Sequence, residues 1–189
     1  MGWKGSGIMI KTLLLLPLFL LISCGEEGKS WPLEYYIHSD YPAEHHKEIF
    51  EAAEILNEAV GETVYEIVGL TTDEKSNEDG KCVIYMLDDI DPKPEVVGKA
   101  IQGNDSCDIT IKSTVFGGCI TYPDGGMICT SGYPFEVNRA IMMHEMIHCG
   151  GVWYHSENEA DLMYKSLRTN VTMPTDWDIE QLKKALDLE

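Results

Sequence analysis

The amino-acid sequence predicts one domain of the α+β class, and three observations carry this prediction. The chain has 189 residues, which is enough for one ordinary domain and too few for two. Its apolar content of 44% is sufficient to build a hydrophobic core. Segments typical of strands and segments of helical periodicity follow one another as strand, helix, strands, helix, irregular segment and helix.

The first half of the predicted domain combines strands with one helix. Residues 33–38, "LEYYIH", are mostly apolar and aromatic, which is typical of a strand. Residues 39–61 are predicted to form a helix that Gly61 ends, because apolar residues recur at helical spacing. These residues are Ile49, Ala52, Ala53, Leu56 and Val60. Two further strands are predicted over 62–70 and 82–89, joined by a polar surface loop.

The middle of the chain is less regular. Residues 91–106 contain two prolines and are predicted to be irregular. Residues 107–114, "CDITIKST", alternate in polarity, which predicts a half-exposed strand. Turn residues and two short apolar runs within 115–134 predict a hairpin or a covering loop.

Two more helices are predicted towards the C-terminus. The first covers 135–151 and is closed by glycines. The second covers 174–189, where Thr175 and Asp178 have the spacing of a capping box, with Asp in place of Glu or Gln.

Residues 1–23 have the composition of a secretory signal: two lysines, an apolar run of eleven residues, and a small residue before Cys24. A membrane anchor or a buried helix is the alternative, but the run is short for a bilayer span. The segment "LISC" resembles the lipobox of bacterial lipoproteins. This resemblance implies that Cys24 is lipidated, and that the protein is exported and anchored to a bacterial membrane on its periplasmic or cell-surface side. Residues 24–32 then form a tether, and 33–189 form the folded domain.

The charge of the chain argues against a nucleic-acid partner. The formal net charge is −18, and it becomes −20 without residues 1–23, which contain two lysines and no acid. A phosphate backbone is repelled by so acidic a surface.

Five cysteines follow Cys24: Cys82, Cys107, Cys119, Cys129 and Cys149. An exported protein can hold disulfides, but the sequence does not determine which cysteines pair. Because Cys107, Cys119 and Cys129 lie close together in a Gly-rich region, we expect a bridge among them. Cys149 is interpreted as a small core residue, with a disulfide half or a redox-sensitive thiol as the alternatives.

The stretch "HEMIH" carries the strongest functional signal. His144 and His148 are four residues apart on a predicted helix, so their imidazoles share one face and can reach one metal ion. Glu145 follows the first histidine, where its carboxylate can act as a general base without being a ligand. Two surface histidines on an ordinary helix are the competing interpretation.

A catalytic zinc usually takes three protein ligands. The glycines after His148 end the helix, and the chain can then turn back and present His155. Nearby oxygen donors are the alternatives for the third ligand: Glu157, Glu159 and Asp161.

The stretch "HEMIHCGGVWYHSENEADLMY" resembles the metzincin family of zinc endopeptidases, in particular its matrixin-like branch. The family pattern is H-E-x-x-H-x-x-G-x-x-H followed by a tight turn around a methionine. His144, Glu145, His148 and Gly151 match it, whereas His155 arrives one residue later than the pattern requires. The segment "ADLMY" resembles the methionine turn, with Met163 as its methionine.

This resemblance implies a metzincin-like α+β fold, with a mixed twisted β-sheet, an active-site helix and a smaller C-terminal subdomain that carries the terminal helix. It also implies a monomeric Zn²⁺-dependent endopeptidase with His144, His148 and His155 as ligands and Glu145 as general base. Met163 would lie beneath the metal. The protein or peptide substrate would lie along an edge strand, for which residues 108–113 are the candidate, and residues 164–172 would wall its pocket.

Two further interpretations remain open at this point. The protein could be a zinc-binding or catalytically inactive surface lipoprotein that acts as a binding module. Separately, the acidic stretches "DDID" and "GNDSCD" are compatible with a Ca²⁺ site, although acidic clusters are more often simply solvated loops.

Overall fold

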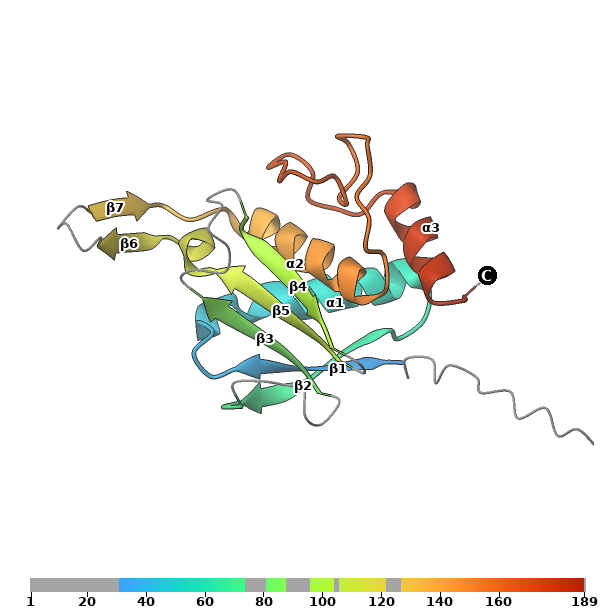
Figure 1. Ribbon diagram of the computed structural model, residues 1–189, viewed down its shortest axis with the longest axis horizontal. Coiled ribbons are helices and arrows are strands. Elements are labelled where there is room, and N and C mark those ends of the chain that lie inside the picture. The colour runs from blue at the N-terminus through green and yellow to red at the C-terminus, as the bar shows by residue number, and fades with distance from the viewer. Residues whose placement is uncertain (1–30, 74–80, 88–95, 104–105, 122–126, 189) are drawn as a thin grey trace, which may run out of the picture.

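The computed structural model describes residues 31–73, 81–87, 96–103, 106–121 and 127–188. Within these residues the protein has a five-stranded mixed sheet, a separate two-stranded hairpin and three α-helices (Figure 1). The predicted α+β class is therefore confirmed. The predicted signal, Cys24 and the tether up to residue 30 lie outside the described residues. In the part that is described, no helix is both long and apolar enough to cross a membrane.

The central sheet has the strand order β2-β1-β3-β5-β4. Its strands are β1 (Leu33–His38), β2 (Tyr65–Thr71), β3 (Cys82–Leu87), β4 (Gly98–Gln102) and β5 (Cys107–Lys112). Each pair of neighbours from β2 to β5 is parallel, and β4 runs antiparallel to β5. One edge of the sheet is therefore the antiparallel strand β4.

Strand β4 corrects two predictions. It lies inside 91–106, which the prolines had suggested was irregular, but both prolines precede the strand. It also covers β5, so the predicted edge segment 108–113 lies between two strands and is not an edge.

Strand β5 is also buried and not half-exposed as predicted. Its polar residues are buried because they find partners in the neighbouring strands. Val83 N–H donates to Asp108 at 2.9 Å, and the Thr110 hydroxyl donates to the Lys99 carbonyl at 3.1 Å. Hydrogen bonding thus makes an alternating sequence acceptable in the interior.

The helices build the second layer. After the 3₁₀ turn η1 (Ala43–His45), α1 (His46–Val60) packs against α2 (Phe135–Cys149) on one face of the sheet (Figure 1). The predicted apolar stripe of α1 is buried there, and Gly61 ends the helix with a φ of 91°. Helix α3 (Asp176–Ala185) begins with the predicted capping box of Thr175 and Asp178.

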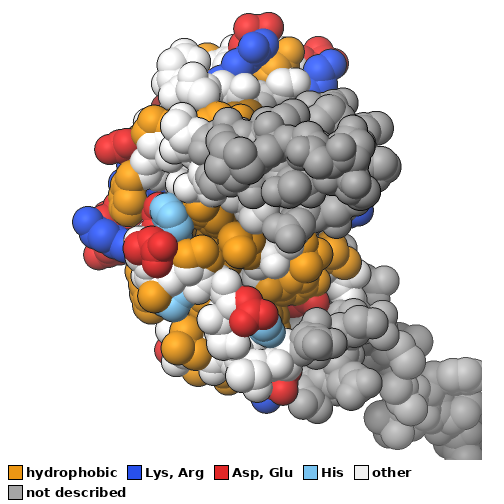
Figure 2. All heavy atoms as spheres, turned by 90° about the vertical axis from the view of Figure 1, so that its left-hand side faces the viewer, with side chains coloured by type: hydrophobic (Ala, Val, Ile, Leu, Met, Phe, Trp, Pro, Cys, Tyr) orange, Lys and Arg blue, Asp and Glu red, His pale blue; other side chains and the backbone are white. Residues whose placement is uncertain are grey.

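The predicted hairpin is confirmed. A 3₁₀ turn, η2 (Ser113–Phe116), leads into β6 (Gly118–Thr121) and β7 (Met127–Thr130), which extend away from the central sheet (Figure 1). Figure 2 views the molecule from this end and shows apolar side chains gathered in the middle of the face, with acidic and basic side chains scattered around them.

A disulfide joins Cys107 to Cys149, so the expected bridge among Cys107, Cys119 and Cys129 does not include Cys107. The bond forms although 42 residues separate the two cysteines, because the start of β5 lies against the last turn of α2 with a Cα–Cα distance of 5.5 Å. Cys149 is therefore a disulfide half and not only a core residue. The backbone positions of Cys119 and Cys129 are partners in the hairpin register, and their side chains lie outside the described ones, so a bridge between these two stays a prediction.

Candidate metal centre

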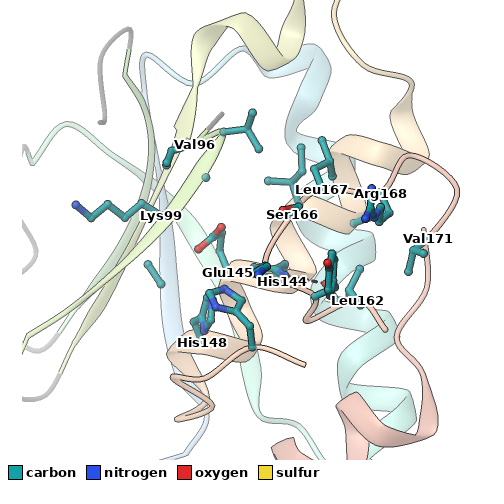
Figure 3. Close-up of a pocket in the computed structure, with 18 of the residues that line it drawn as sticks. Val96, Lys99, His144, Glu145, His148, Leu162, Ser166, Leu167, Arg168 and Val171 are labelled. Atoms are coloured by element: carbon teal, nitrogen blue, oxygen red, sulfur yellow. Dashed lines mark hydrogen bonds between the residues drawn. The ribbon is translucent and has the colours of Figure 1, made fainter. Parts of the chain in front are cut away.

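Helix α2 carries the "HEMIH" stretch through the interior of the protein. Eleven of its 15 residues are buried, because the helix packs against β4 and β5 of the sheet and against α1 beside it, while Leu182 of α3 covers its end. Its side chains are consequently fixed in place. His144, Glu145 and His148 point from this helix into a cavity of about 360 Å³ (Figure 3).

Both helical histidines are oriented by backbone carbonyls. Nδ1 of His144 lies 2.8 Å from the carbonyl oxygen of Leu162, and Nδ1 of His148 lies 2.6 Å from that of Val152. A protonated Nδ1 that donates to a carbonyl leaves Nε2 with its lone pair, which is the form that binds a metal. Both rings are therefore prepared to use Nε2 as a ligand.

The extra residue before His155 is absorbed where the helix ends. Gly150 fits closely between neighbours, since a Cβ there would lie 2.4 Å from Leu182 and 2.5 Å from the Tyr65 hydroxyl. Gly151 then takes a φ of 109°, which turns the chain back towards the helix. Trp153 and Tyr154 form an exposed bulge, after which His155 returns to the cavity.

His155 consequently joins the two helical histidines. Its ring centroid lies 5.3 Å from that of His144 and 4.9 Å from that of His148. One potential ligand nitrogen from each histidine lies within 4.8 Å of the other two. Zn–N bonds of about 2 Å at tetrahedral angles place ligand atoms about 3.3 Å apart, so small rotations of the rings would suffice to bring the three nitrogens onto one ion. The three histidines could therefore hold one metal ion.

The electrostatics of the site favour neutral imidazoles. Burial lowers the pKa of His144 to about 3, and the neighbouring His148 adds to the effect. Burial also lowers the pKa values of His148 and His155. Metal binding requires unprotonated imidazoles, so protons compete with a metal only under acidic conditions.

Two of the three oxygen donors considered as alternatives have other partners, and the third, Glu157, is exposed and does not line the cavity. Asp161 accepts hydrogen bonds from the hydroxyls of Ser156 and Thr175, at 2.6 and 2.9 Å. Glu159 pairs with Arg168 at 2.9 Å. Within the residues that the structure describes, the group suited to a metal consists of the three histidines and includes no carboxylate.

Glu145 lies beside the histidines in a tight pocket. Its side chain is 6% exposed, and burial raises its pKa to about 8, while the backbone N–H of Ala100 donates to it. Gly98 allows β4 to approach this closely, because a Cβ at that position would lie 2.6 Å from Oε1 of Glu145. The general-base candidate is thus placed by β4 as much as by its own helix.

The turn around Met163 is held rigidly next to the three histidines. Met163 is fully buried, and its carbonyl accepts from Ser156 N–H at 2.9 Å. The carboxylate of Asp178 accepts from the N–H groups of Leu162 and Met163, at 2.9 and 3.0 Å. The sequence indicated Asp178 only as a helix cap, because its second role depends on a contact across 15 residues.

Three parts of the chain enclose the cavity. Helix α2 forms its floor, β4 and the two residues before it form one side, and the segment after the Met163 turn forms the other side. That segment includes Leu167, Arg168 and Val171, so the predicted wall within 164–172 does line the cavity (Figure 3). The open edge of the sheet therefore runs along the row of candidate ligands.

The calcium prediction receives no support from the described residues. The stretch "DDID" lies outside them, as do two residues of "GNDSCD". Asp108 in the second stretch is buried and accepts from a backbone N–H.

Comparisons with protein-family models and with curated proteins found no match, so the function is inferred from the geometry of the site. No protein-family model matches this chain, and no curated protein matches it.

Proposed function

We propose that this protein is a zinc-dependent endopeptidase of the metzincin type, exported and lipid-anchored through Cys24, that hydrolyses peptide bonds of extracytoplasmic proteins. One observation carries the proposal: three neutral histidines converge beside a buried glutamate, in a cavity bordered by an edge strand. A purely structural metal site would not need that glutamate.

The chemistry follows from the residues present. Zinc bound by His144, His148 and His155 would supply a Lewis acid that polarises the scissile carbonyl and acidifies water. Glu145 takes the proton of the attacking water and passes it to the leaving amine. The Leu162 and Val152 carbonyls keep the histidine rings in position during this transfer.

The substrate is positioned by backbone pairing. Among the described strands β4 pairs only with β5, so its other side is an open edge on which an extended peptide can pair, although the N–H of Ala100 already donates to Glu145. Gly98 and Ala100 adjoin Glu145, so a peptide paired with β4 would have its backbone next to the general base. This pairing replaces the expected one along 108–113.

The proposal is tested with residues 24–189 loaded with zinc and an unfolded protein as substrate. We expect cleavage, and we expect Glu145→Ala to reduce it by at least a factor of about 100 while zinc remains bound. Glu157→Ala is the matched control, because Glu157 is an exposed carboxylate close to His155 that does not line the cavity, and it should keep full activity.

The opposite results are equally clear. Unchanged cleavage by Glu145→Ala would show that another group is the base. If the zinc-loaded chain cleaves neither the unfolded protein nor a broad peptide library, the protein is a binding module and not an enzyme.

A further inference from the structure

Trp153 is a large aromatic residue whose position the metal site itself does not explain. It belongs to the bulge that absorbs the extra residue between His148 and His155. Its side chain is 44% exposed, and it lines the cavity. Its ring is nearly parallel to that of His148, with 9° between the planes and 6.0 Å between the centroids.

The residues on either side of Trp153 hold it in place. Val152 is buried, and its carbonyl lies 2.6 Å from Nδ1 of His148. Tyr154 points the other way, where its hydroxyl donates to Gln181 at 2.8 Å and its ring meets Trp177 edge-on. Trp153 is thus a preorganised aromatic surface, which loses little freedom when a ligand packs on it.

The position of Trp153 in the cavity determines which part of a substrate it meets. His148, on which Trp153 stacks, lies on the opposite side of His144 from Arg168 and Val171 (Figure 3). Trp153 therefore borders the end of the cavity away from the pocket wall that those two residues form.

The direction of β4 assigns that end to one side of the cleaved bond. Gly98 lies beside Ile141 and Glu145, and Ala100 further along donates to Glu145, so β4 runs in the same direction as α2 and towards His148. Antiparallel pairing is slightly more stable per residue than parallel pairing, and a peptide that pairs antiparallel to β4 runs away from His148. Its residues on the amino side of the cleaved bond lie at the Trp153 end.

We propose that Trp153 is a specificity-determining residue that selects an apolar or aromatic side chain on the amino side of the cleaved bond. The exposed indole offers such a side chain a flat apolar partner. A cationic side chain is disfavoured, because Lys165 lines the same cavity and a bound metal ion adds further positive charge. This inference rests on the proposed function, since it presumes a peptide in the cleft.

The test measures binding separately from cleavage. Zinc-loaded Glu145→Ala protein is titrated calorimetrically with matched peptides that differ in the residues before the cleavage position: Phe or Leu in one set, Ala or Lys in the other. We expect the first set to bind about fivefold to tenfold more tightly. Adding Trp153→Ala should abolish this difference, and Trp153→Phe should restore most of it.

Tyr133→Ala is the matched control. Tyr133 is a comparably exposed aromatic residue, at 38%, that does not line the cavity, so its removal should leave the selectivity intact. Zinc content is measured in every variant, because a purely structural role of Trp153 would lower zinc binding and reduce the affinity for all peptides equally.

The outcomes separate the two proposals. Selectivity that survives Trp153→Ala, an equal loss for all peptides, or no peptide binding at all would overturn the role of Trp153. If peptides bind with Trp153-dependent selectivity but the unmodified protein cleaves none of them, Trp153 still determines which side chain is bound, and the endopeptidase proposal fails.

Discussion

At the scale of single residues, the general-base candidate is fixed by a close contact between Glu145 and Gly98. The carboxylate is buried, and β4 approaches it so closely that no side chain fits between them. This contact shields Glu145 from water, which raises the pKa of its carboxyl group in the metal-free protein, whereas a bound zinc ion would favour the ionised form that a general base requires.

Replacing Gly98 tests this contact. In Gly98→Ala the new Cβ would meet Oε1 of Glu145 at 2.6 Å and Ile141 at 3.0 Å, so the carboxylate or the strand must shift. We expect kcat to fall by about tenfold or more with unchanged zinc content, because small misplacements of a catalytic group are costly. Gly69→Ala is the control, since nothing lies within 4 Å of its Cβ position. Equal activities of the two variants would contradict the account.

The burial of Glu145 also predicts a pH dependence of stability in the metal-free protein. Its pKa is raised from 4.5 to about 8 on folding, so the folded state binds the proton more tightly. The resulting stabilisation is complete below about pH 4.5 and is lost as the pH rises to about 8. Glu145→Gln removes this titration.

The measurement is urea unfolding of both proteins in the presence of a chelator at pH 5 and pH 8. The stability of Glu145→Gln relative to the unmodified protein should increase by about 1 kcal/mol or more between these pH values, since one pKa unit corresponds to about 1.4 kcal/mol. The histidines are present in both proteins, so their titration cancels. If the difference in stability between the two proteins does not change with pH, the carboxyl group of Glu145 is not buried in the metal-free protein.

At the scale of secondary-structure elements, α3 fixes the Met163 turn and β5 fixes the end of α2, and the site depends on both. The Asp178 carboxylate connects the start of α3 to the Met163 turn, and the Leu162 carbonyl in that turn orients His144. The disulfide between Cys107 and Cys149 connects β5 to the residue directly after His148.

Asp178→Asn is expected to weaken metal binding from a distance. The amide keeps one acceptor oxygen where the carboxylate offers two, so a buried N–H of Leu162, Met163 or Thr175 loses its partner. We expect a tenfold or greater loss of zinc affinity, measured by competition with a chromophoric chelator. Asp176→Asn, in the exposed first turn of the same helix, should keep the affinity within about twofold. Equal zinc affinities of Asp178→Asn and Asp176→Asn would refute the connection between Asp178 and the metal site.

Removal of the disulfide should lower global stability. The bridge closes a segment of 42 residues, for which the chain-entropy estimate is about 4 kcal/mol. The double variant Cys107→Ser, Cys149→Ser should therefore unfold at a clearly lower urea concentration, and reductant should shift the unmodified protein to the same midpoint. An unchanged midpoint would show that this bond does not form in solution.

The elements differ in how far sequence could predict them. Helices α1, α2 and α3 were predictable because their apolar periodicity, glycine stops and capping box are local signals. Strand β4, "GKAIQ", has no run of β-branched residues, and its conformation depends on pairing with β5. The disulfide also depends on packing, so nearness in sequence could not reveal that Cys107 pairs with Cys149, 42 residues away.

At the scale of the whole molecule, the candidate centre is assembled from parts that are distant in the chain. Strand β4, helix α2 and the segment after Met163 meet at one cavity. The motif predicted the identity of His144, Glu145, His148 and His155, because their spacing is local. It could not predict that Gly98 packs on Glu145 or that Trp153 lies over His148, because both contacts arise only when the chain is folded.

The central claim is that the extra residue before His155 is absorbed and that His155 completes a three-histidine metal centre. X-ray absorption spectroscopy of the zinc-loaded protein, compared with His155→Ala, tests this claim most directly because it counts the imidazoles bound to the ion. We expect three imidazoles on the ion in the unmodified protein and two in the variant. Two imidazoles in both proteins, with an unchanged spectrum, would contradict it.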